Sequence, residues 1–256
     1  MKKIQLGIIG CDSYHTVTLV EQYLKMDGVE IVFVDNTIRG NMNMSLKRQA
    51  RFEHALKDRV KLEKIDLNNH QAVDLYLILN VDSSEHLNTI KALTQYNKPI
   101  FVDKPIFSNM ESFDEVKANI MSSSALRFAS FMKDVVLSNP IIIEAPIEFV
   151  EEVEGYFWYG IHMLEMLQTL SKSSISIESF EDNIVRGTSG AYDFELRGLS
   201  ESNFKVLTES GVYELESYDD LYHSLAMAIL DTQSWQTLDN TKMVIEAVLS
   251  INSLMR

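Results

Sequence analysis

The residue best placed to do chemistry is Lys104, in the segment Pro99-Ile100-Phe101-Val102-Asp103-Lys104-Pro105-Ile106. The apolar start of this segment predicts a buried strand that ends at Asp103. In an open parallel sheet, ligands bind just outside the carboxyl ends of the strands. Pro105 fixes the backbone directly after Lys104. We therefore expect Lys104 to present an ammonium group to a cleft; a solvated lysine at an ordinary strand end is the alternative.

A second candidate site is the turn after the first predicted strand, Gly7-Ile8-Ile9-Gly10-Cys11-Asp12-Ser13-Tyr14-His15. In a dinucleotide-binding turn of pattern G-x-G-x-x-G, small residues allow a tight turn and a close approach to pyrophosphate. Here the pattern is G-x-D-x-x-H. Gly10, Asp12, Ser13 and His15 are thus cofactor candidates. Asp12 or Ser13 could instead cap the following helix, and His15 could simply pack.

Asp35 ends the second predicted strand, in the region where dinucleotide-binding proteins carry an acidic residue. A carboxylate there accepts hydrogen bonds from the ribose hydroxyls of NAD and repels the 2′-phosphate of NADP. Asp35 therefore favours NAD, while the nearby Arg39 leaves NADP open.

The elements that must position these residues follow from hydrophobic periodicity. In the first half we expect strands over 3–9, 30–35, 61–65, 74–80 and 99–103, with helices over 13–25, 44–57, 84–96 and 111–121. Strands that alternate with helices predict a parallel, doubly wound sheet, the Rossmann arrangement of an α/β protein.

The second half changes character, because predicted strands follow one another. We expect strands over 125–130, 141–147, 175–180, 192–196, 205–208 and 212–215, with helices over 156–170, 221–230 and 242–254. This order predicts a smaller α+β domain with a mostly antiparallel, open sheet. We place a dinucleotide-binding domain over 1–122 and a substrate and oligomerisation domain over 123–256.

Composition narrows the classes of function. The 256 residues carry a formal charge of −14, which argues against nucleic acid or anionic membrane as a partner. The single cysteine, Cys11, allows no internal disulfide, and no Cys/His cluster has zinc spacing, so we expect no metal. With no run of 18 apolar residues and no signal-peptide pattern at the N-terminus, we expect a cytoplasmic protein.

With these motifs in view, the chain resembles the Gfo/Idh/MocA family of oxidoreductases, which joins a Rossmann domain to a domain with an open, mostly antiparallel sheet. The family's E-K-P motif matches Asp103-Lys104-Pro105, with Asp for Glu, and implies that Lys104 lies beside nicotinamide and substrate. Residues 78–86 resemble the loop after the family's fourth strand. The resemblance makes Asn80 and His86 cofactor candidates; His86 as a helix residue without a ligand is the alternative.

A third motif is Tyr156-Phe157-Trp158-Tyr159-Gly160-Ile161-His162-Met163-Leu164-Glu165. The family pattern D-x-G-x-H-x-x-D implies that His162 is catalytic, and Glu165 matches the later acid. Trp158 replaces the earlier acid, and Tyr159 becomes a candidate to share proton transfer. The chain resembles a divergent branch with the G-x-D-x-x-H turn and a shortened second domain. Without the resemblance, His162 reads as a core histidine.

Together these features predict an NAD(P)-dependent oxidoreductase for a small polyhydroxylated molecule, a sugar or cyclitol. An imidazole can take the hydroxyl proton, and the Lys104 ammonium can polarise the oxygen. The alternative is a catalytically inactive nucleotide-binding sensor or partner subunit on the same fold. A Rossmann-type methyltransferase leaves the D-K-P motif unexplained. The resemblance also implies a homo-oligomer.

Overall fold

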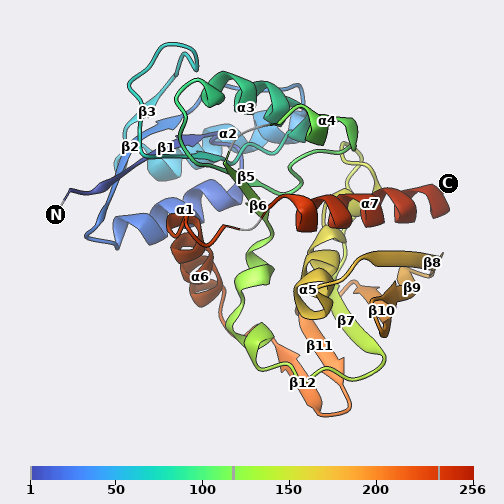
Figure 1. Ribbon diagram of the computed structural model, residues 1–256. Coiled ribbons are helices and arrows are strands. Elements are labelled where there is room, and N and C mark those ends of the chain that lie inside the picture. Colours follow the sequence, from blue (N-terminus) through green and yellow to red (C-terminus); the bar gives the residue numbers. More distant parts are fainter. Residues whose placement is uncertain (1, 117–118, 236) are drawn as a thin grey trace. The chain divides into compact units, whose positions relative to one another are not determined.

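The computed structural model describes residues 2–116, 119–235 and 237–256, which form two compact units (Figure 1). The first unit comprises Met1–Phe107, Glu111–Ser122 and Ala226–Thr237. The second comprises Ser108–Met110, Ser123–Leu225 and Leu238–Arg256. The chain therefore passes from one unit to the other several times.

The first unit contains a six-stranded sheet of order β3-β2-β1-β4-β5-β6. Its strands are β1 (Ile4–Ile9), β2 (Val29–Asp35), β3 (Leu62–Glu63), β4 (Leu75–Ile78), β5 (Ile100–Asp103) and β6 (Ile120–Ser123). The pairings of β1 with β2 and β4, of β2 with β3, and of β4 with β5 are all parallel. This confirms the expected Rossmann arrangement.

Helices cover both sides of this sheet. They are α1 (Tyr14–Leu24), α2 (Asn43–Leu56), α3 (His86–Thr94), which follows the short 3-10 turn η1 (Ser83–Glu85), and α4 (Glu111–Asp114). In Figure 1, α1 and α3 lie on opposite sides of the sheet, as right-handed crossovers require when strand order reverses between β1 and β4. All four residues of β4 are buried, which explains its uninterrupted apolar sequence.

The second unit contains another six-stranded sheet, of order β12-β11-β7-β10-β9-β8. Its strands are β7 (Ile141–Pro146), β8 (Ile175–Glu181), β9 (Ile184–Ser189), β10 (Tyr192–Leu199), β11 (Lys205–Thr208) and β12 (Gly211–Glu214). Only the central pair, β7 with β10, is parallel among the described pairings, and the others are antiparallel. This confirms the expected mostly antiparallel sheet.

One face of the second sheet packs on helices α5 (Ile161–Ser171) and α7 (Asp239–Leu254). Residues alternate along β7, so that Ile141, Ile143 and Ala145 are fully buried toward the helices. The opposite face is partly exposed and carries an ion-pair ladder across neighbouring strands. The ladder runs Arg186, Glu195, Arg197, Glu144 and Lys205. Helix α6 (Tyr218–Leu230) contributes residues to both units.

Three expected elements were wrong. The helix expected over 111–121 ends at Asp114, because Ile120–Ser123 forms the edge strand β6; residues 117 and 118 lie outside the described part. The strand expected over 125–130 is instead two 3-10 turns, η2 (Ala125–Phe128) and η3 (Ser130–Lys133). Ser124 caps η2 by accepting a hydrogen bond from the Leu126 N–H at 3.2 Å.

The helix expected over 156–170 is divided into the 3-10 turn η4 (Gly155–Phe157) and α5. The Tyr156 ring packs against Gly160 so closely that a β-carbon there would overlap it. The chain also forms β9, a strand that we did not expect. Within the described residues, every helix is too short or too polar to cross a bilayer.

The close approach of two backbone segments around Gly10 holds the first turn in place. Gly10 has φ of +100°, and a β-carbon there would lie 2.7 Å from the Asn80 Cα and closer still to the Asn80 nitrogen. The Gly10 carbonyl accepts a hydrogen bond from Thr16 at 3.0 Å, which joins the turn to α1. Glycine is therefore required at this position.

We predict that Gly10→Ala lowers the free energy of unfolding by on the order of 2–4 kcal/mol, because it adds both backbone strain and overpacking. Urea unfolding followed by circular dichroism measures the change. Gly28→Ala is the matched control, since a β-carbon at Gly28 meets no atom within 4 Å. If Gly10→Ala changes the free energy of unfolding no more than Gly28→Ala does, the close approach of Gly10 to Asn80 is unimportant for stability.

Candidate functional site

The residues expected to bind a cofactor gather at the carboxyl ends of the first sheet. Gly10 follows β1, Asp35 ends β2, Asn80 follows β4, and Lys104 follows β5. Because these strands are parallel, their carboxyl ends share one edge of the sheet. The structure thus brings residues from four separate sequence segments to this edge.

Asp12 occupies the second position of the glycine-type turn and is only 4% exposed. Its carboxylate accepts hydrogen bonds from the Val81 N–H, at 3.3 Å to each oxygen, and does not cap α1. Burial raises the pKa of Asp12, which the bonds from Ser45 and Val81 only partly offset. Burial likewise raises the pKa of the neighbouring Cys11 thiol to about 12, so this cysteine is unreactive.

Ser13 is the N-cap of α1, because its hydroxyl accepts a hydrogen bond from the His15 N–H at 3.1 Å. The His15 side chain turns to the end of β5, where Nδ1 lies 2.7 Å from Asp103 Oδ2. This hydrogen bond joins the first turn to the D-K-P motif. No sequence pattern predicts it, because 87 residues separate the two partners in the chain.

Asp103 also orients Lys104, whose backbone N–H donates to Asp103 Oδ1 at 2.8 Å. Although burial raises the pKa of Asp103, the charge and hydrogen bond of His15 and the charge of Lys104 outweigh it, so the pKa is lowered. The Lys104–Pro105 peptide bond is cis. The Lys104 side chain is half-buried beside this anionic carboxylate.

The Asp35 carboxylate is fully buried, and both of its oxygens are engaged by protein groups. Oδ1 accepts from the backbone and hydroxyl of Thr37, at 3.0 and 2.6 Å, and from the Ile65 N–H at 3.0 Å. Oδ2 accepts from the Arg39 guanidinium. Arg39 retains a small exposed fraction, and its buried Nε has no hydrogen-bond partner among the described residues.

Asn80 and His86 have different environments. The His86 ring is 1% exposed, and its nitrogens lie 2.9 Å from the Asn80 carbonyl and 3.0 Å from the Ile106 carbonyl. In this position His86 supports the loops after β4 and β5. Asn80 donates from Nδ2 to the Asp82 carbonyl at 2.9 Å, while its buried Oδ1 has no hydrogen-bond partner among the described residues.

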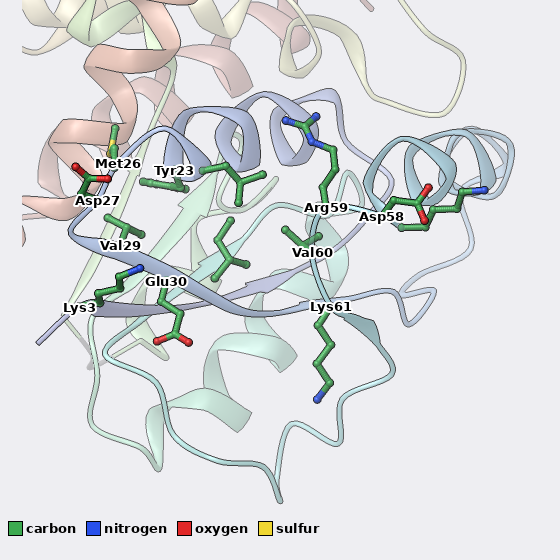
Figure 2. A pocket seen from close by; sticks show the side chains of 13 residues that line it. Lys3, Tyr23, Met26, Asp27, Val29, Glu30, Asp58, Arg59, Val60 and Lys61 are labelled. Carbon is green, nitrogen blue, oxygen red and sulfur yellow. The ribbon is translucent and has the colours of Figure 1, made fainter.

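A pocket of about 560 Å³ lies at the other edge of this sheet, near the amino ends of β1 and β2 (Figure 2). Residues of both charges line it, including Lys3, Asp27, Glu30 and Arg59. Arg59 is already paired with Glu21. The pocket is therefore separate from the edge where Gly10 and Lys104 lie.

In the second unit, His162 lies in the first turn of α5 and Tyr159 directly precedes that helix. His162 Nδ1 lies 2.6 Å from the hydroxyl of Ser124, a fully buried residue. The His162 ring also makes edge-to-face contacts with Tyr159 and Phe204, with centroid distances of 5.9 and 5.6 Å. Ser124, Tyr159 and Phe204 thus all help to orient this imidazole.

Glu165, one turn further along α5, is 1% exposed and pairs with Arg127 rather than with His162. Arg127 donates to Glu165 Oε2 from both Nε, at 2.8 Å, and Nη2, and to Gln168 at 3.0 Å. Arg127 is thus part of a structural ion pair.

Two site features escaped sequence reasoning. Ser124 belongs to no family motif and lies at the end of an unexpected strand, so only the folded chain brings it to His162. The four-residue separation of Asp35 and Arg39 is compatible with an ion pair. Nothing in the sequence indicated that Thr37, Ile65 and Arg39 would surround the Asp35 carboxylate.

Comparison with known proteins supports the fold. No protein-family model matches the chain, and no curated protein matches its sequence. Among solved structures, a myo-inositol dehydrogenase from Corynebacterium glutamicum is 13% identical with a TM-score of 0.72, covering 98% of this chain and 96% of that one. A scyllo-inositol dehydrogenase from Lactobacillus casei, solved with NAD(H) and scyllo-inositol, is 12% identical with a TM-score of 0.73, covering 99% and 97%.

An oxidoreductase from Agrobacterium radiobacter, in complex with NAD+, L-tartaric acid and magnesium, is 11% identical with a TM-score of 0.68, covering 100% of this chain and 98% of that one. The chain has the fold of Gfo/Idh/MocA oxidoreductases. This agrees with the family resemblance of its three motifs.

The lowered pKa of Asp103 predicts how stability depends on pH. A carboxyl group whose pKa is lower in the folded state stabilises the fold above its unfolded value, and this contribution disappears as pH falls through the folded value. We predict that Asp103→Asn costs about 1.5–3 kcal/mol near pH 6, as expected for a charge-assisted hydrogen bond. The cost should shrink as pH falls below 3.8, the ordinary value for Asp.

Urea unfolding at a series of pH values measures this difference. The exposed Asp58→Asn variant controls for the loss of one negative charge. A cost for Asp103→Asn that stays constant down to pH 2.5 would contradict the assignment.

Proposed function

We propose that this protein is an oxidoreductase that uses a nicotinamide dinucleotide to oxidise or reduce a small polyhydroxylated molecule, a sugar or cyclitol. The observation that carries the proposal is the shared edge formed by Gly10, Asp35, Asn80 and Lys104 on a Rossmann sheet. The inositol dehydrogenases with which the chain shares its fold support the substrate class.

The residues at this edge suit a dinucleotide in two respects. The buried Oδ1 of Asn80 has no hydrogen-bond partner in the described part of the chain and would accept one from a ligand. The Gly10 turn precedes the N-terminus of α1, the usual position of a pyrophosphate. The residues that we propose to bind the cofactor are Gly10, Asp12, Ser13, His15, Asp35, Asn80, His86 and Lys104.

Oxidation of an alcohol removes a hydride from carbon and a proton from oxygen, and leaves a carbonyl group. Nicotinamide, when bound, supplies the hydride acceptor. Lys104, His162 and Tyr159 are the proposed catalytic residues that handle the oxygen and its proton. Lys104 would stabilise the negative charge that develops on oxygen, and Asp103 would position the backbone of Lys104.

We predict that Lys104→Ala lowers kcat roughly 10²–10³-fold, the usual effect of removing one donor that stabilises an oxyanion. The assay follows NADH absorbance with a panel of inositols, sugars and sugar acids. Lys91→Ala is the matched control, because Lys91 is exposed on α3 and pairs with Glu115. Turnover that survives in Lys104→Ala at the wild-type rate would refute the catalytic role.

A second candidate function is nucleotide binding without turnover, in a sensor or a partner subunit. Trp158 favours it, because an apolar ring stands where the resembled family has a carboxylate beside the histidine. Calorimetry with millimolar dinucleotide separates the two functions. Binding without oxidation of any compound in the panel supports the second, whereas absence of binding contradicts both.

NAD is the proposed cofactor. The Asp35 carboxylate is fully buried and already engaged by Thr37, Ile65 and Arg39, so the Asp35–Arg39 pair, rather than Asp35 alone, offers a test of the choice. We predict that Arg39→Ala weakens the binding of NADPH about tenfold or more relative to that of NADH. The guanidinium of Arg39 would contact the 2′-phosphate of NADPH, and it also partly neutralises the Asp35 carboxylate with which it pairs. Titration of both cofactors by fluorescence measures the ratio. An unchanged ratio would place the 2′-position away from this pair.

A homo-oligomer stays part of the proposal. The face of the second sheet that α5 and α7 leave uncovered carries the ladder of charges from Arg186 to Lys205.

A further inference from the structure

The hydrogen bond between Ser124 and His162 determines which imidazole nitrogen carries the proton. Ser124 is fully buried, and its Oγ has two close neighbours among the described residues: the Leu126 N–H at 3.2 Å and His162 Nδ1 at 2.6 Å. A backbone N–H can only donate, so one lone pair of the hydroxyl is used by Leu126.

The remaining question is which partner donates in the Ser124–His162 bond. If Nδ1 donated, Ser124 would accept twice, and its own hydrogen would need an acceptor that the described residues do not provide at this buried site. An unsatisfied buried donor costs about 1–3 kcal/mol.

His162 lies in the first turn of the eleven-residue helix α5, and its ring makes edge-to-face contacts with Tyr159 and Phe204. Glu165, the acid one turn further along the same helix, is held by Arg127.

We propose that the Ser124 hydroxyl donates its hydrogen to His162 Nδ1 and thereby holds the neutral imidazole with its proton on Nε2. A neutral imidazole has one donor and one acceptor nitrogen, so Nε2 becomes the donor. A carboxylate in this position would do the reverse, since it accepts from Nδ1–H and leaves Nε2 as the base. Ser124 is therefore a positioning residue whose effect on the imidazole is the reverse of a carboxylate's.

This tautomer refines the role of His162, and the refinement rests on the proposed function. With its proton on Nε2, His162 donates a hydrogen bond to the substrate oxygen and stabilises negative charge there.

Nitrogen NMR tests the tautomer without cofactor or turnover. Long-range ¹H–¹⁵N spectra of the full chain with ¹⁵N-labelled histidine distinguish protonated from unprotonated ring nitrogens, and His162→Gln identifies the signals. We expect neutral His162 to be protonated at Nε2. Protonation at Nδ1 would overturn the proposal, whatever the protein's activity. A failed proposed function would show as absent turnover and leave these spectra unchanged.

Variants of Ser124 separate the hydrogen bond from general packing. Ser124→Thr keeps a hydroxyl and should retain the Nε2–H signature, whereas Ser124→Ala should give a mixture of tautomers and lower kcat roughly tenfold with little change in cofactor affinity. Ser123→Ala is the matched control, because its buried hydroxyl bonds the Ser124 carbonyl and not the ring. A wild-type signature in Ser124→Ala would also overturn the proposal.

Discussion

The contact of Gly10 with the backbone of Asn80 is the constraint on which the first unit depends. It joins the carboxyl ends of β1 and β4, the two strands between which the sheet order reverses. A crevice for a ligand arises at such a reversal because the two connections leave the sheet on opposite sides. A side chain at Gly10 would push these strand ends apart, so the site exists only because this residue lacks one.

Three buried acids surround this edge, and each is compensated in a different way. Asp12 accepts hydrogen bonds from a backbone N–H, Asp35 is enclosed by Thr37, Ile65 and Arg39, and Asp103 pairs with His15. In a chain with a formal charge of −14, an anionic ligand can approach only where local negative charge is neutralised. Arg39 beside Asp35 and Lys104 beside Asp103 supply positive charge on this edge of the sheet.

Sequence reasoning predicted the parts of the fold that depend on local pattern. The apolar runs of β1, β4 and β5 and the helical period of α1 all reflect burial in the first unit. It failed where tertiary contacts override local preference. Ile120–Ser123 reads as the end of a helix, but pairing at the sheet edge makes it β6.

The same distinction holds for the site. Lys104 and Gly10 could be recognised because their neighbours in sequence define their position. Folding alone brings His15 to Asp103 and Ser124 to His162. No spacing in the sequence predicts these contacts. The proposed roles of these pairs depend on which atom holds a proton, a property that belongs to the pair.

The several crossings of the chain between the two units have a consequence for how the protein matures. A nascent polypeptide that has emerged as far as Ser123 carries every strand of the Rossmann sheet, yet it lacks Ala226–Thr237, which completes that body and supplies the carbonyl that Tyr23 contacts. Residues that follow the second sheet in the chain therefore complete the unit that precedes it. Neither body is one continuous segment of the chain, so a truncation that removes one also removes part of the other.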